Sequence, residues 1–154
     1  MAVCGSGGAA AAELEAAEAL GRELAARGAV LVCGGLGGVM EAACRGAREG
    51  GGTTLGILPG YDRGEANEFV DVAVATGLGE ARNALVVRAA DAVVAVGGEW
   101  GTLSEIALAL RAGKPVVGLG TWELPERGGR GIVAAASPRE AVELALGDLP
   151  PSGS

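Results

Sequence analysis

The sequence predicts an α/β fold: a doubly wound, mostly parallel sheet with helices on both faces, Rossmann-like and in a single domain. Short, almost continuous apolar runs alternate with longer runs whose apolar residues recur at helical spacing. Glycine-rich segments join these runs, and Gly makes up 29 of the 154 residues. The length suits one domain with a sizeable core.

The first part of the chain alternates strand and helix twice. An apolar strand at 1–5 is followed by a glycine loop and a helix at 10–27. The apolar stripe of this helix is Leu14, Ala17, Leu20 and Leu24. Its exposed side carries two charged pairs at i,i+4 spacing, Glu18–Arg22 and Glu23–Arg27. Gly28 ends this helix. A strand at 29–33, a glycine loop at 34–38 and a helix at 39–49 repeat the order. Glu41, Arg45 and Glu49 of the second helix also stand at i,i+4 spacing.

The second part continues the alternation. A strand at 53–59, a polar surface loop at 60–69 and a further strand at 70–76 come first. The remaining elements are a helix at 79–90, a strand at 91–96, a glycine loop at 97–101, a helix at 102–112, a strand at 114–120, a loop at 121–131, a strand at 131–136 and a helix at 137–146. We take 1–147 as the domain and 148–154 as a flexible C-terminal tail.

Composition excludes several classes of function. The chain has no His, which removes the usual general base and the commonest metal ligand, and we expect no metal site. A net charge of −7 with one lysine, Lys114, provides no basic face for nucleic acid or an anionic membrane. Cys4, Cys33 and Cys44 have no metal-ligand spacing and read as small buried hydrophobes. With no signal peptide or membrane-length apolar run, the expected location is cytoplasmic.

The three glycine loops favour an anionic ligand. Each follows a strand, so all three open at the carboxyl edge of a parallel sheet, where helix N-termini direct amide groups toward a ligand. Phosphate is the natural candidate, although tight strand-to-helix turns alone also require Gly.

Two common cofactors do not fit these loops. Gly5, Gly7 and Ala10 match a dinucleotide fingerprint, but the second strand ends without the acidic residue that binds ribose, so we expect no NAD. The only lysine lies in a Gly-Lys-Pro turn, so neither a Walker A loop nor a pyridoxal phosphate site is expected.

The segments "GGLGGVMEAA", "GEARNALVVRAADAVVAVGGEWGTLSEIALAL" and "GKPVVG" resemble the superfamily of the LONELY GUY phosphoribohydrolases and the molybdenum cofactor carrier proteins. The resemblance spans roughly 3–120, and "MEAA" and "LSEIA" are closer to the carrier branch. In the hydrolase branch a P-G-G-x-G-T-x-x-E motif binds the phosphate of a nucleoside monophosphate, and an Arg with the motif's Glu assists cleavage of the N-glycosidic bond. The resemblance puts these roles on Arg82, Thr102 and Glu105.

This chain departs from the motif at two positions. Gly97 replaces the motif's Pro, and Glu99 replaces its second Gly. If position 99 needs a positive φ, a non-glycine residue there costs about 1 kcal/mol or more, and its carboxylate repels a phosphate unless it points away or binds a cation. The departure favours binding over hydrolysis.

Several candidate residues have a structural alternative. Thr102 and Glu105 also form a capping-box pattern, which recurs at Ser137 and Glu140. Met40 reads as core, and Glu41 reaches a ribose or pairs with Arg45. Trp100 stacks on a base or covers the core, whereas Trp122 is expected in packing.

The candidate binding residues are Gly5, Ser6, Gly7, Gly34, Gly35, Gly37, Gly38, Met40, Glu41, Arg82, Asn83, Gly97, Gly98, Glu99, Trp100, Gly101, Thr102 and Glu105. Glu105 and Arg82 are the catalytic residues if the chain is an enzyme. The first hypothesis is binding of a nucleotide or a molybdopterin-like phosphorylated cofactor, the second is nucleoside 5′-monophosphate phosphoribohydrolysis, and the third is an oligomer with a vestigial site. High apolar content predicts a homodimer or homotetramer.

Overall fold

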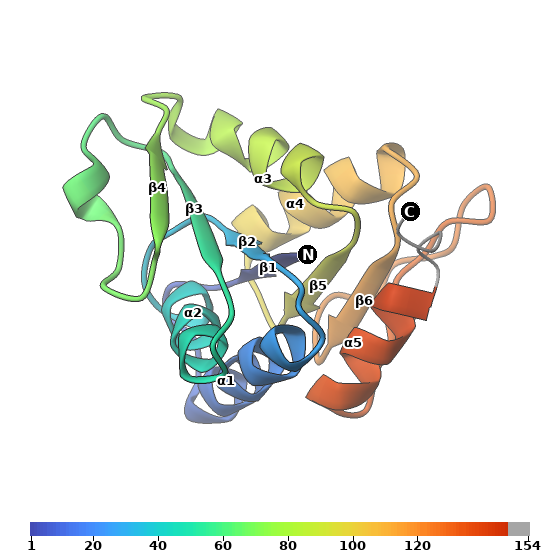
Figure 1. Cartoon of the computed structure of the whole chain (residues 1–154). Helices are drawn as coiled ribbons and strands as arrows, with labels where there is room; N and C mark the ends of the chain where they lie inside the picture. The colour runs from blue at the N-terminus through green and yellow to red at the C-terminus, as the bar shows by residue number, and fades with distance from the viewer. Residues whose placement is uncertain (148–154) are drawn as a thin grey trace, which may run out of the picture.

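The computed structural model describes residues 1–147, so the predicted tail at 148–154 lies outside the described residues. At its centre lies a seven-stranded sheet in the order β4-β3-β2-β1-β5-β6-β7, with every pair of neighbours parallel (Figure 1). The strands are β1 (Ala2–Gly5), β2 (Leu31–Cys33), β3 (Thr54–Leu58), β4 (Val72–Ala75), β5 (Val93–Val96), β6 (Val116–Leu119) and β7 (Val133–Ala134). The predicted doubly wound α/β fold is confirmed.

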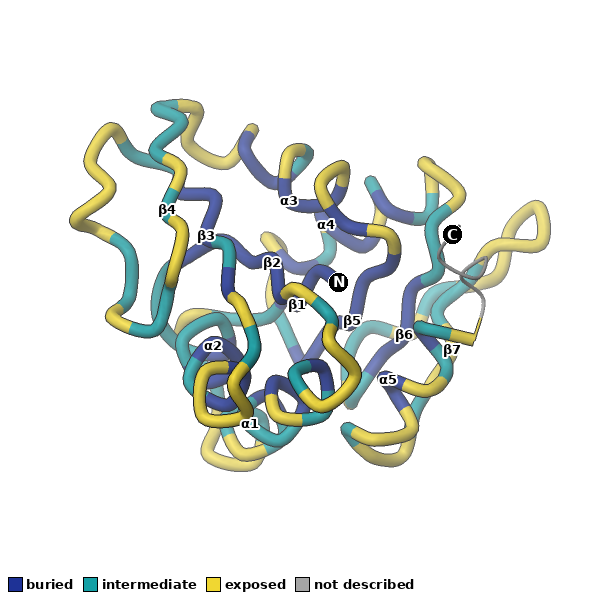
Figure 2. The backbone as a smooth tube through the Cα atoms, in the orientation of Figure 1, coloured by how far each residue is buried: buried dark blue, intermediate teal, exposed yellow. Residues whose placement is uncertain are grey.

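Helices cover both faces of the sheet. One face carries α1 (Ala11–Ala26), α2 (Val39–Glu49) and α5 (Pro138–Gly147), and the other carries α3 (Asn83–Ala89) and α4 (Trp100–Arg111) (Figure 1). Successive strand side chains point to opposite faces, so Val3 joins the core under α1 and α2 while Cys4 joins the core under α3 and α4. The central strands are accordingly buried, as Figure 2 shows.

The predicted element boundaries shift at several places. The helix expected at 79–90 divides into a 3₁₀ turn, η2 (Gly79–Arg82), and α3, and the helix expected at 102–112 begins two residues earlier, at Trp100. The strand expected at 131–136 pairs only over β7, and the surface loop at 60–69 contains the 3₁₀ turn η1 (Arg63–Glu65).

The predicted ion pairs form along α1 but not along α2. Glu18 pairs with Arg22, and Glu23 pairs with Arg27 at 2.5 Å. Arg45 does not pair with Glu41; its Nε donates to Glu18 of α1 at 2.9 Å. This pair therefore joins the two helices.

The topology places a crevice at one end of the sheet. The chain leaves β1 toward β2 on one side, while β5 pairs with the other side of β1 in register from Ala2↔Val93 to Gly5↔Val96. The order of the strands thus reverses between β1 and β5, and doubly wound proteins bind ligands beyond the carboxyl ends of the strands at such a point. Within residues 1–147, no helix has both the length and the apolar character that crossing a membrane requires.

Candidate functional site

A pocket of about 430 Å³ lies at this crevice. Its volume is within the range of small-molecule binding sites. It is bounded by the end of β1 and its glycine loop, by η2 and the start of α3, and by the first turns of α4. The lining residues are Val3, Cys4, Gly5, Ser6, Gly7, Leu36, Met40, Pro59, Gly79, Glu80, Arg82, Asn83, Glu99, Gly101, Thr102 and Glu105.

Two glycines outside the lining pack closely against residues that line this pocket. Gly38 has a φ of +65°, and a Cβ there would lie 2.2 Å from the carbonyl oxygen of Ser6. Its absence lets the second glycine loop pack against the first, where the Val39 amide donates to Ser6 O at 3.0 Å. Gly98 has a φ of +109°, and a Cβ there would lie 2.5 Å from Cβ of Thr102. Both positions require Gly for conformation and for space.

Arg82 brings a buried positive charge to the pocket wall. Only 8% of its surface is exposed. Its guanidinium donates to Oδ1 of Asn83 and, at 3.4 Å, to the carbonyl oxygen of Gly34. Its Nε is buried and has no hydrogen-bond partner among the described residues. Protein atoms cover this nitrogen, and an unpaired buried donor of this kind costs free energy.

Glu105 is the buried carboxyl group of the same pocket. It lies in the second turn of α4 with 7% of its surface exposed. Burial raises its pKa to about 7, although hydrogen bonding to the Cys4 thiol and the positive charge of Arg82 both act to lower it. The carboxyl group is therefore poised between its two protonation states at neutral pH.

A series of side-chain hydrogen bonds connects Arg82 to the start of α4. Asn83, which accepts from Arg82, donates through Nδ2 to Oγ of Ser104 at 2.9 Å. The Ser104 hydroxyl in turn donates to the carbonyl oxygen of Gly101 at 2.8 Å. This network fixes η2 and α4 relative to each other across the pocket.

Glu99 fits its position without backbone strain. Its φ is −110° and its ψ is −158°, and no non-glycine residue in the described chain has a positive φ. Its backbone is extended immediately before Trp100, so the cost expected for a positive φ does not arise.

The predicted binding residues divide into two groups. Those that line the pocket are Gly5, Ser6, Gly7, Met40, Arg82, Asn83, Glu99, Gly101, Thr102 and Glu105. Those outside its lining are Gly34, Gly35, Gly37, Gly38, Glu41, Gly97, Gly98 and Trp100.

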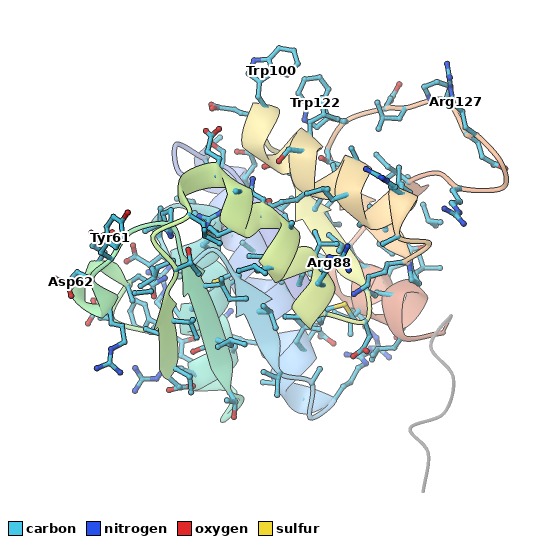
Figure 3. The ribbon with its side chains drawn as sticks, turned by 90° about the horizontal axis from the view of Figure 1, so that it is seen from above. Tyr61, Asp62, Arg88, Trp100, Trp122 and Arg127 are labelled. Carbon is cyan, nitrogen blue, oxygen red and sulfur yellow. The ribbon has the colours of Figure 1, made fainter. Side chains whose placement is uncertain are left out.

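The second group lies close by. Glu41 borders a smaller hollow of about 270 Å³ that also touches Gly7 and Gly38, and Gly97 and Gly98 border another of about 340 Å³ beside Trp122. Trp100 is 76% exposed and lies against Trp122, with ring centroids 5.2 Å apart (Figure 3). Its ring neither covers the core nor reaches the pocket.

Sequence reasoning missed six lining residues, namely Val3, Cys4, Leu36, Pro59, Gly79 and Glu80. For Cys4 and Pro59 a signal was present, since each stands at the carboxyl end of a predicted parallel strand. Gly79 and Glu80 belong to η2, and no signal pointed to them because the sequence predicted one continuous helix over 79–90.

Comparison with known proteins is consistent with this geometry. A protein of unknown role from Archaeoglobus fulgidus is 42% identical over 127 residues, covering 82% of this chain and 81% of that protein. The molybdenum cofactor binding protein from Rippkaea orientalis is 39% identical, with a TM-score of 0.83 over 93% of this chain and 91% of the other. The molybdenum cofactor carrier protein from Chlamydomonas reinhardtii is also 39% identical, with a TM-score of 0.83 over 96% of this chain and 97% of the other.

A more distant relative belongs to the hydrolase branch. A probable cytokinin riboside 5′-monophosphate phosphoribohydrolase, LOGL9, from Oryza sativa subsp. japonica is 38% identical over 95 residues. That match covers 60% of this chain and 42% of the rice protein. The model of the SLOG cluster4 family matches residues 1–142. The chain therefore belongs to the SLOG cluster4 family.

Proposed function

We propose that this protein binds a small phosphorylated molecule, a nucleoside monophosphate or a molybdopterin-like cofactor, in the pocket beyond β1 and β5. The observation that carries the proposal is the guanidinium of Arg82, which belongs to the only cationic residue among those that line the pocket. A guanidinium on the pocket wall offers directional donors that suit phosphate oxygens. The amides of the glycine loop after β1 and of the first turn of α4 provide further donors.

The family relationships support a carrier or binding role. The Rippkaea and Chlamydomonas proteins are named for binding or carrying the molybdenum cofactor. Their similarity extends over almost all of this chain. We propose the same class of ligand here.

Calorimetric titration with AMP and with molybdopterin tests the proposal. We expect at least one of them to bind wild-type protein. Arg82→Met should lower the affinity for that ligand at least tenfold, because a charge-assisted contact is lost. Arg82→Lys keeps the charge and should lose less affinity. Arg88→Met, which removes an exposed cation from the adjoining helix α3, serves as the control. Equal affinity of wild type and Arg82→Met for every bound ligand would contradict the proposal.

Glu105 favours a second candidate function, hydrolysis of the N-glycosidic bond of a nucleoside 5′-monophosphate. A carboxyl group with a pKa of about 7 can donate a proton to a departing base and then accept one from water. Arg82 would hold the phosphate of the same substrate. The similarity to the rice phosphoribohydrolase supports this alternative.

Incubating the protein with AMP and measuring released adenine by chromatography distinguishes the two functions. Hydrolysis predicts adenine release that Glu105→Gln reduces at least a hundredfold, a typical loss for a general acid–base group. Binding alone predicts that AMP stays intact with both wild type and Glu105→Gln.

A further inference from the structure

The hydrogen-bond series from Arg82 to α4 has one member outside the pocket. Arg82, Asn83 and Gly101 all line the pocket, whereas Ser104 is exposed and does not line it. The Ser104 hydroxyl nevertheless connects the other three residues, since it accepts from Nδ2 of Asn83 at 2.9 Å and donates to the carbonyl oxygen of Gly101 at 2.8 Å. No pattern in the sequence marks this residue.

The direction of each bond in the series follows from the guanidinium of Arg82. Because an arginine side chain can only donate, the Asn83 carboxamide must present its oxygen to Arg82. Its nitrogen then faces Ser104, whose hydroxyl accepts this bond and has its own proton left for Gly101. The Ser104 hydroxyl is therefore the group that fixes the far side of the carboxamide.

The side chain of Asn83 is engaged by the protein on both sides. Only 7% of the residue is exposed, and its Oδ1 and Nδ2 atoms both have side-chain partners. A ligand that took either partner's place would have to break a buried hydrogen bond. The carboxamide thus faces Arg82 and Ser104, although the residue borders the pocket.

Few other contacts orient the Arg82 guanidinium. Its remaining hydrogen bond among residues 1–147 runs from Nη2 to the carbonyl oxygen of Gly34, and at 3.4 Å it is longer than an ordinary N–H···O bond. Its Nε has no partner, and no carboxylate within residues 1–147 lies at ion-pair distance from it. The Asn83 carboxamide is therefore the main group that orients this cation.

We propose that Ser104 is a positioning residue for binding of the ligand's phosphate group. Through Asn83 it holds the guanidinium of Arg82 in one orientation, with the remaining N–H groups available to phosphate oxygens. Through Gly101 it links this orientation to the first turn of α4. A side chain that is already ordered loses less entropy when the ligand binds, so the series raises affinity. The inference rests on the proposed function, because it assumes that a phosphate group enters this pocket.

Calorimetric titration of Ser104→Ala with AMP and with molybdopterin tests the proposal on the full chain. Each ligand that wild type binds should bind the variant about fivefold more weakly, the effect of one lost hydrogen bond. Ser104→Thr keeps the hydroxyl, and its added methyl group meets solvent at this exposed position. It should restore the affinity to within about twofold of wild type.

The same substitution in an Arg82→Met background separates positioning from a general loss of stability. If Ser104 acts through Arg82, adding Ser104→Ala to Arg82→Met should change the affinity by less than about twofold, because the group that it positions is absent. Equal losses in the two backgrounds would contradict this route.

Ser137→Ala is the matched control for the loss of a serine hydroxyl near the start of a helix. Oγ of Ser137 accepts from the Glu140 amide at 3.2 Å, and α5 lies on the face of the sheet opposite α4 (Figure 1). Ser137 does not line the pocket, so the variant should keep wild-type affinity.

The outcomes distinguish the positioning role from the proposed function. Arg82-dependent binding with the same affinity in wild type and Ser104→Ala would overturn the role of Ser104 while the proposed function stands. A Ser104→Thr variant as weak as Ser104→Ala would also overturn it, since the hydroxyl is present in the first and absent from the second. Failure of wild type to bind either ligand would overturn both.

Discussion

At the scale of single residues, Glu105 shows how one pattern can serve two different structures. The Thr-x-x-Glu spacing at Thr102 predicts a capping box, but α4 begins at Trp100, so Glu105 lies beyond the first turn and faces the pocket. The same spacing at Ser137 does cap a helix: the Glu140 amide donates to Oγ of Ser137 at 3.2 Å, and the Glu140 carboxylate accepts from the Ala136 amide. The sequence could not separate them, because the start of α4 depends on how the loop before it packs.

The raised pKa of Glu105 predicts that stability falls as pH rises. The carboxyl group has a pKa of about 7 in the folded protein and about 4.5 when unfolded. Between these values the folded state holds a proton that the unfolded state has released, so the free energy of unfolding decreases with pH by about 3 kcal/mol in total. Below pH 4.5 and above pH 7 this contribution is constant.

Glu105→Gln should remove this dependence. The amide resembles the protonated acid, so the variant should match wild type near pH 4.5 and exceed its stability above pH 7. Urea unfolding at pH 4.5, 6 and 8 measures the difference, with exposed Glu123→Gln as the control. A stability difference that does not change between pH 4.5 and pH 8 would contradict the raised pKa.

At the scale of elements, α1 and α2 approach each other at two glycines. A Cβ on Gly21 would lie 2.1 Å from the carbonyl oxygen of Ala43, and one on Gly46 would lie 1.9 Å from that of Glu18. Backbone atoms on the opposite helix fill the space that a side chain would need. The sequence places glycines inside both helices but gives no sign of this contact, because it depends on the crossing of two elements.

Gly46→Ala should destabilise the protein although Ala is the better helix former. Helix propensity alone predicts a gain of up to about 1 kcal/mol, but the new methyl group must push two helices apart, and we expect a net loss of at least about 2 kcal/mol. Gly101→Ala in α4 is the control, since a Cβ there meets open space. Thermal unfolding of both variants measures the effect, and equal stability of Gly46→Ala and wild type would rule out the close approach.

Other features of the elements were visible in the sequence. The apolar runs predicted where the strands fall along the chain, since each run has the length and the continuous apolar character of one strand in a sheet that is covered on both faces. The glycine loops after β1 and β5 identified the carboxyl edge where the pocket lies. Arg82 was a candidate by resemblance, but its burial and unpaired Nε depend on the packing of η2 against Gly34, which local spacing does not encode.

At the scale of the whole molecule, exposed apolar side chains gather at one edge of the sheet. Val72 and Val74 of β4 are 52% and 44% exposed, and nearby Leu78 is 53% exposed. The register of β3 and β4 pairs Val72 with Leu55 and Val74 with Ile57, so these valines belong to the sheet face that carries α3. The helices stop short of β4 on this face, and Figure 2 shows the strand partly exposed.

The homodimer or homotetramer expected from the composition stays a prediction, and this edge is where we expect a second copy to pack. Light scattering after size-exclusion chromatography should give a mass of at least twice the 15.0 kDa chain. The double variant Val72→Glu, Val74→Glu should shift it to 15.0 kDa, because two buried charges would oppose association. Val30→Glu introduces the same charge at another exposed valine and should leave the oligomer intact. A wild-type mass of 15.0 kDa at micromolar concentration would contradict the oligomer, whereas an oligomer that survives the double variant would place the interface elsewhere.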